Sequence, residues 1–80
     1  MLESGSAGLA AETFDTIAQT PSLSPSLRAA ALLNAGKAFV EANDTDLAFE
    51  RFASAELTAT DPATRAQARF DTGAARVRLA

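Results

Sequence analysis

The chain has 80 residues, a formal net charge of −3 and neither cysteine nor histidine, which limits it to one small domain without disulfides, the usual zinc ligands or the commonest general base. We therefore predict no enzyme activity, no metal centre and no cofactor, and the acidic balance disfavours nucleic-acid binding. The sequence contains no apolar run long enough to cross a bilayer and no signal-peptide pattern, so it predicts no membrane segment and leaves the compartment open.

Alanine dominates the sequence, and with leucine, glutamate and arginine it favours helix. Because no apolar–polar alternation of strand length occurs, we predict an all-α chain of about four helices. Residues 1–4 resemble the last turn of a helix, and Gly5 is predicted to end it in a left-handed conformation. The first full helix is predicted from about Ala7 to Gln19, before Thr20 and Pro21.

The second helix is predicted from Pro25 to about Ala42, with Ser24 as its cap and Pro25 in the first helical position. Its polar wedge is narrow and the rest of its circumference is alanine, leucine, phenylalanine and valine. A helix that is apolar over most of its surface is packed on two sides. The wedge consists of Asn34, Lys37 and Glu41.

The third helix is predicted from Thr45 or Asp46 to about Thr58, and the fourth from Pro62 toward Ala80 with Asp61 as its cap. Asp44 or Asp46 can cap the third helix. A cation loop is the other interpretation of these acids together with Glu50, but the segment lacks the central glycine and closing glutamate of an EF-hand, which favours capping.

Small and large residues alternate at helical spacing in the middle of the chain, which predicts closely packed helices that approach each other at Gly36 and Ala48. The five phenylalanines are predicted to be core residues. They are Phe14, Phe39, Phe49, Phe52 and Phe70. The residues predicted to pack between helices are Phe14, Leu32, Gly36, Phe39, Ala48, Phe52, Ala55 and Gly73.

The sequence repeats itself with a period of 37 to 38 residues. Residues 5–10 align with 43–48 at a shift of 38, and residues 25–31 align with 62–68 at a shift of 37. A fixed period of this length is typical of helical repeat arrays. We expect a single repeat segment over residues 1–80, with two repeats at about 1–38 and 39–75 and the last helix continuing to 80.

The central hairpin resembles the tetratricopeptide repeat. Gly36, Ala48 and Phe52 match that family's small and aromatic positions directly, and Leu32, Ala35 and Phe39 stand where the family has Trp, Leu and Tyr. The resemblance implies antiparallel hairpins of an α-solenoid. Because the repeats are out of phase with the hairpin unit and neither end has the pattern of a polar cap, we expect a piece of a longer array or a chain that self-associates.

The resemblance also implies a protein-interaction scaffold that holds a peptide or partner helix in a concave groove. The groove residues it implies are Leu33, Asn34, Lys37, Val40, Glu41, Phe70, Asp71, Ala74, Val77 and Arg78. A clamp for a terminal carboxylate is not expected, because Leu33, Phe70 and Ala74 replace the polar residues that such a clamp needs. A plain solvated edge without a ligand is the alternative for these positions.

Two other classes of function stay open. One is a small structural protein that self-associates through its open end faces, without a peptide ligand. The other, less favoured, is a nucleic-acid binder that uses the basic stripe of the last helix, Arg65, Arg69 and Arg76. A solvated face that pairs with Glu56 or Asp61 explains this stripe better, because no aromatic stacking residues are interleaved with it.

Overall fold

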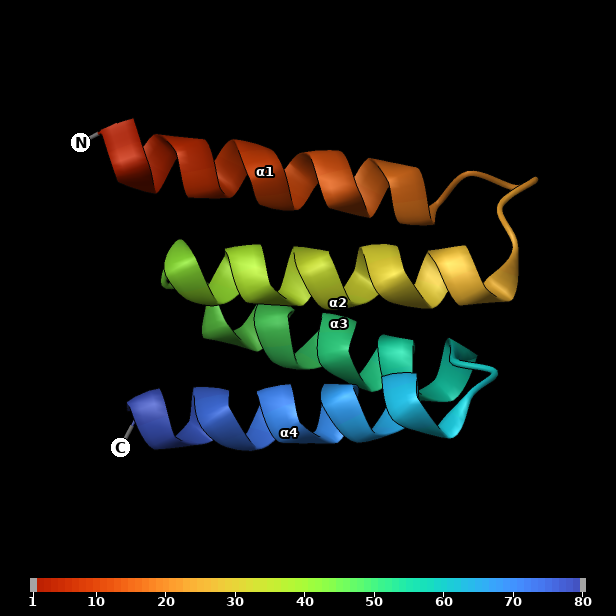
Figure 1. Ribbon diagram of the computed structural model, residues 1–80. Helices are drawn as coiled ribbons and strands as arrows, with labels where there is room; N and C mark the ends of the chain where they lie inside the picture. Colours follow the sequence, from red (N-terminus) through yellow and green to blue (C-terminus); the bar gives the residue numbers. More distant parts are fainter. Residues whose placement is uncertain (1, 80) are drawn as a thin grey trace.

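The computed structural model describes the backbone of residues 2–79 and the side chains of residues 6–77. Four α-helices follow one another: α1 (Leu2–Ala18), α2 (Pro25–Glu41), α3 (Thr45–Thr58) and α4 (Pro62–Leu79). The predicted all-α fold is confirmed. The helices lie side by side and alternate in direction, with α1 and α4 at opposite edges (Figure 1).

Two predicted helix starts are confirmed. Ser24 Oγ accepts the backbone N–H of Leu27 at 3.3 Å, and Pro25 is the first residue of α2. At α4, Asp61 Oδ2 accepts the Thr64 N–H at 2.9 Å. Each cap satisfies a donor that has no partner inside its helix.

The turn between α2 and α3 is a Schellman motif. Asn43 has a φ of 64°, as predicted for a left-handed residue. Its N–H donates to Val40 O at 3.0 Å, and the Asp44 N–H donates to Phe39 O at 2.8 Å. Asp44 occupies the cap position of α3, but its side chain accepts no hydrogen bond from the described first turn. The predicted capping by Asp44 is therefore wrong, and Asp46 contributes only an acidic residue to that turn.

The predicted helix break at Gly5 is also wrong. Helix α1 runs without interruption from Leu2, and no described glycine has a positive φ. Alignment with the turn at Asn43 suggested the break, but residues 5–9 contain neither a proline nor an acidic capping residue. Continued helical hydrogen bonding therefore costs only the low helix propensity of glycine, roughly 1 kcal/mol.

Helix α2 is the centre of the fold, and α1 and α3 pack on its two sides while α4 packs mainly on α3. This arrangement confirms the prediction that α2 is buried on two sides. The described core is mostly alanine, joined by Leu32, Leu33, Phe39 and Phe52. Phe14 and Phe49 are half-buried against it. Phe70 is 70% exposed, so the prediction that it is a core residue is wrong.

Gly36 is a point of close approach between α2 and α3. A Cβ built on Gly36 would lie 2.5 Å from Cε1 and 2.6 Å from Cδ1 of Phe52. Phe52 is only 1% exposed, so its ring has little room to move away. The close packing predicted for Gly36, Ala48 and Phe52 is therefore present.

Candidate functional site: a groove along α2 and α4

A hollow of about 460 Å³ lies along the polar wedge of α2, between α1 on one side and α4 on the other. Side chains of Phe14, Ala38 and Phe52 supply apolar surface, and Val40 and Ala75 extend it. The polar residues that line it are Asn34, Lys37, Glu41 and Asp71. An apolar surface with a few polar groups beside it is the usual composition of a binding site.

Lys37 and Asp71 connect the two walls of the hollow. Lys37 Nζ on α2 lies 3.9 Å from Asp71 Oδ2 on α4, which makes an ion pair but no hydrogen bond. The other carboxylate oxygen, Oδ1, accepts Gln67 Nε2 at 3.0 Å. Asp71 Oδ2 is buried and has no hydrogen-bond partner among the described residues. Such an acceptor is stabilised by any ligand that brings it a donor.

The structure brings together six of the ten residues predicted for a groove. They are Asn34, Lys37, Val40, Glu41, Asp71 and Ala74. Leu33 is buried in the core, so its predicted place in the groove is wrong. It lies next to Asn34 in the sequence, but one residue turns a helix by about 100°, which is enough to point it inward. The side chain of Arg78 lies outside the described residues.

Phe70 and Val77, the remaining two, line a different surface. They border a second hollow on α4 together with Arg69, Gly73 and Ala74. Their side chains are 70% and 76% exposed. Apart from its two chain neighbours and the backbone of its own helix, no described heavy atom lies within 4 Å of a Cβ built on Gly73. The packing predicted for Gly73 is therefore not made within the described chain.

The arginines of α4 are turned toward α3. Arg69 Nε donates to Glu56 Oε2 at 2.6 Å, as the solvated-face interpretation predicted. Arg65 Nη2 donates to Ala59 O at 3.2 Å, and the guanidinium of Arg76 lies 5.9 Å from the centre of the Phe49 ring. These contacts engage all three guanidinium groups, so the stripe is accounted for by packing between helices.

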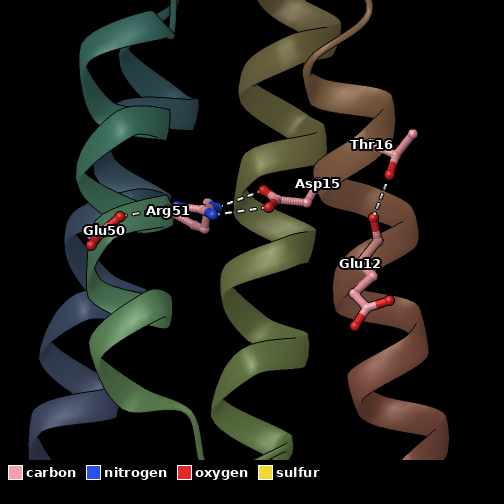
Figure 2. A network of polar contacts seen from close by, with 5 residues as sticks. All are labelled: Glu12, Asp15, Thr16, Glu50 and Arg51. Atoms are coloured by element: carbon pink, nitrogen blue, oxygen red, sulfur yellow. Dashed lines mark hydrogen bonds and ion pairs between the residues drawn. The ribbon is translucent and has the colours of Figure 1, made fainter.

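A cross-helix ion pair is the main contact that the sequence did not predict. Arg51 on α3 reaches past α2 to Asp15 on α1, with Nε 2.5 Å from Oδ1 and Nη2 2.9 Å from Oδ2 (Figure 2). The guanidinium also lies 5.6 Å from the centre of the Phe39 ring and donates to Glu50. The hydrogen bonds to Asp15 are the largest cause that raises the pKa of Arg51.

The sequence carried only a weak signal for this pair. Asp15 and Arg51 are 36 residues apart, close to the repeat period, so they occupy neighbouring turns of successive repeats. The positions that align with them at a shift of 38, Ala53 and Thr13, form no such pair. Periodicity alone therefore does not predict the contact.

Among the side chains of residues 6–77, no group of acidic residues is arranged to hold a metal ion. No described helix is long and apolar enough to span a membrane. Comparison with protein-family models, with curated proteins and with solved structures found no match to this chain.

Proposed function

We propose that this protein is a helical-repeat scaffold that binds a segment of a partner protein in the groove along α2 and α4. The observation that carries the proposal is the hollow of about 460 Å³, in which six predicted groove residues meet. This volume falls within the range of about 300–1,000 Å³ typical of binding sites. It accommodates a few side chains of a bound segment.

The polar groups define the chemistry of the segment. Asp71 Oδ2 needs a donor, because Lys37 Nζ lies 3.9 Å away and makes no hydrogen bond with it. The groove therefore favours a segment that presents an apolar side chain to Phe14 and Val40 and a lysine, arginine or backbone N–H to Asp71. Apolar burial supplies affinity, and the charged contact fixes the register.

A displayed library of random peptides tests this proposal. Selection on the 80-residue protein is expected to enrich sequences with an apolar residue near a lysine or arginine. Asp71→Asn keeps the shape of the side chain and removes its charge. Because a hydrogen bond to a charged group contributes about 1.5–3 kcal/mol, the substitution is expected to weaken binding of the selected peptides about tenfold or more.

Two bulky substitutions, one inside the groove and one outside it, test where the peptide binds. Asn34 and Ala53 are both exposed, on α2 and α3 respectively, but only Asn34 lines the groove. Asn34→Trp is expected to abolish binding, whereas Ala53→Trp, which adds the same bulk outside the groove, is expected to leave it unchanged. Selected peptides that bind both variants equally, or a selection that yields no binder, would contradict the proposal.

A further inference from the structure

The two edge helices, α1 and α4, each expose a face whose counterpart in the middle of the array is buried. On α4 this face, the α4 open face, consists of Ala66, Phe70, Gly73 and Val77. In the repeat alignment with a shift of 37, these residues correspond to Ala29, Leu33, Gly36 and Val40 of α2. The first three of those are buried and Val40 is half-buried, and Phe52 of α3 covers this face at Gly36.

Helix α1 shows the complementary difference. Its exposed face, the α1 open face, consists of Ala10, Phe14 and Ile17. In the repeat alignment with a shift of 38, these residues correspond to Ala48, Phe52 and Ala55 of α3. Those three α3 residues are all buried. On α1, Ala10 and Phe14 are only half-buried, and Ile17 is 42% exposed. Thus the α4 open face corresponds to the face of α2 that carries Gly36, and the α1 open face corresponds to the face of α3 that carries Phe52.

We propose that a second copy of this chain lays its α1 open face on the α4 open face of the first, and so rebuilds the α2–α3 packing between two molecules. In this contact Phe14 of one copy lies over Gly73 of the other, as Phe52 lies over Gly36 within the chain. A ring can approach Gly73 because no described atom occupies the space over it.

The direction of the helices agrees with this pairing. Within the chain α2 and α3 are antiparallel, and the start of α1 and the end of α4 lie on the same side of the array (Figure 1). A second copy stacked in the same orientation therefore places its α1 antiparallel to α4. The contact is head to tail, and such contacts continue into open arrays unless the rotation between copies closes a ring.

The charges of the two edge helices favour the pairing of α4 with α1 of a second copy over the pairing of two α4 helices. Helix α1 carries Glu3, Glu12 and Asp15 and no basic residue, whereas α4 carries four arginines against Asp71. Asp15 and Arg69 are already paired within the chain with Arg51 and Glu56, but the remaining charges of the two edge helices are still opposite. These charges attract in a head-to-tail contact, while two copies of α4 would repel each other. Association is therefore expected to weaken as salt is added.

Sedimentation velocity of the 80-residue protein across a wide concentration range tests the proposal. The wild-type chain is expected to form concentration-dependent oligomers. A Cβ built on Gly73 meets no described atom outside its chain neighbours and its own helix backbone, so Gly73→Leu extends into open space. It is expected to weaken association about tenfold or more because the helices can no longer approach. Ala53→Leu, exposed on α3 outside both faces, is the matched control and is expected to associate like wild type.

A mixing experiment establishes the head-to-tail geometry. Gly73→Leu retains an intact α1 face, and Ile17→Glu retains an intact α4 face. Each variant alone is expected to be monomeric, and the two together are expected to form a heterodimer that cannot grow. If Ile17→Glu loses helicity by circular dichroism, Gly73→Leu mixed with wild type serves instead. It should bind the end of a wild-type oligomer through its α1 face and stop further growth, so the oligomers become shorter.

Three results would overturn the inference. A wild-type chain that stays monomeric at every concentration shows that no second copy covers these faces. Unchanged association of folded Gly73→Leu or Val77→Glu excludes the α4 open face. Association that folded Ile17→Glu leaves intact, or a mixture of variants that remains monomeric, excludes the head-to-tail contact. Phe14 belongs to both the groove and the α1 open face, so peptide binding and self-association share that ring. Asn34→Trp and Asp71→Asn change only the groove, and Gly73→Leu and Val77→Glu change only the α4 open face, so these variants distinguish the two.

Discussion

Gly36 and Gly73 occupy matching positions in the repeat, yet their surroundings are opposite. Gly36 lies against the ring of Phe52, whereas a Cβ built on Gly73 has no described heavy atom from another helix within 4 Å. The absence of a side chain at Gly36 is therefore a packing requirement between two helices. A glycine inside a helix costs about 1 kcal/mol relative to alanine, and at Gly36 the close approach of α3 offsets that cost.

Substituting the two glycines with alanine isolates this packing effect. Both changes gain the same helix propensity, but only Gly36→Ala forces a Cβ into the buried ring of Phe52. We expect Gly36→Ala to be less stable than Gly73→Ala by about 1–3 kcal/mol. Urea unfolding at low protein concentration, where association does not contribute, measures the difference.

Gly36→Leu extends the same test. The larger side chain is expected to unfold the α2–α3 hairpin, because it cannot be accommodated beside Phe52. Equal unfolding midpoints for the two alanine variants, or wild-type circular dichroism and melting of Gly36→Leu, would show that the helices do not approach as closely as described.

At the scale of single elements, the helix ends are set by side chains within a few residues of them. Ser24 caps α2, Asp61 caps α4 and Asn43 ends the α2–α3 hairpin turn in a left-handed conformation. The cap of α4 is the most complete of these, since both Asp61 oxygens accept Thr64 Oγ1 at 2.9 Å in addition to the backbone contact. The start of α4 should therefore respond to the charge of Asp61.

The pH dependence of stability tests this cap. The hydrogen bond from the Thr64 N–H is the largest cause that holds the pKa of Asp61 below its ordinary value. A carboxylate with a lowered pKa contributes stability above its unfolded pKa, near 3.9, and loses that contribution as the pH falls through the folded value. Asp61→Asn should therefore melt below wild type at pH 7, and the gap should close as the pH falls below about 4.

The equivalent substitution at the start of α3 serves as the control for this experiment. Asp44 occupies the cap position, but its side chain accepts no hydrogen bond from the described first turn. Asp44→Asn is expected to leave the melting temperature at pH 7 almost unchanged. A gap between Asp61→Asn and wild type that is the same at every pH would show that the charge of Asp61 does not stabilise α4.

At the scale of the whole molecule, the four helices form a slab of 35 × 26 × 15 Å. Its thinnest dimension is little more than the diameter of one helix with its side chains, about 10–12 Å, so few side chains lie far from solvent. This explains why the described core is mostly alanine and why Phe52 is its one large side chain that is almost fully buried. In so thin an array, contacts between non-adjacent helices contribute to holding the edges in place.

The Asp15–Arg51 pair is such a contact, because it ties the edge helix α1 to α3 across α2 (Figure 2). Both side chains are about 80% buried, so the pair is shielded from salt and solvent better than a surface pair. Asp15→Asn is expected to lower the free energy of unfolding by about 1–3 kcal/mol and to increase amide hydrogen exchange in α1.

Glu50→Gln provides the comparison for this prediction. Glu50 also pairs with Arg51, at 3.2 Å, but its side chain is largely exposed. Its loss should cost less than about 1 kcal/mol, as for an ordinary surface pair. Equal effects of Asp15→Asn and Glu50→Gln on urea unfolding would mean that the contact across α2 does not stabilise the array.

The sequence by itself determined what depends on neighbours along the chain. The caps at Ser24 and Asp61, the left-handed Asn43 and the close approach at Gly36 all follow from local hydrogen bonds or from the small size of one residue. Six of the ten residues that the family resemblance implied for a groove also line one hollow, because those on each helix are spaced to share a face. The repeat alignment failed at Gly5, since helix formation there depends on local propensity and not on the period.

Only the tertiary structure decided which faces are covered. Leu33 enters the core while its repeat counterpart Phe70 is exposed, because α3 packs over the first and no described helix packs over the second. Likewise, Arg51 finds Asp15 only once α2 has brought α1 and α3 to its two sides. Burial and long-range ion pairs depend on what lies across from a residue, and that is a property of the assembled helices.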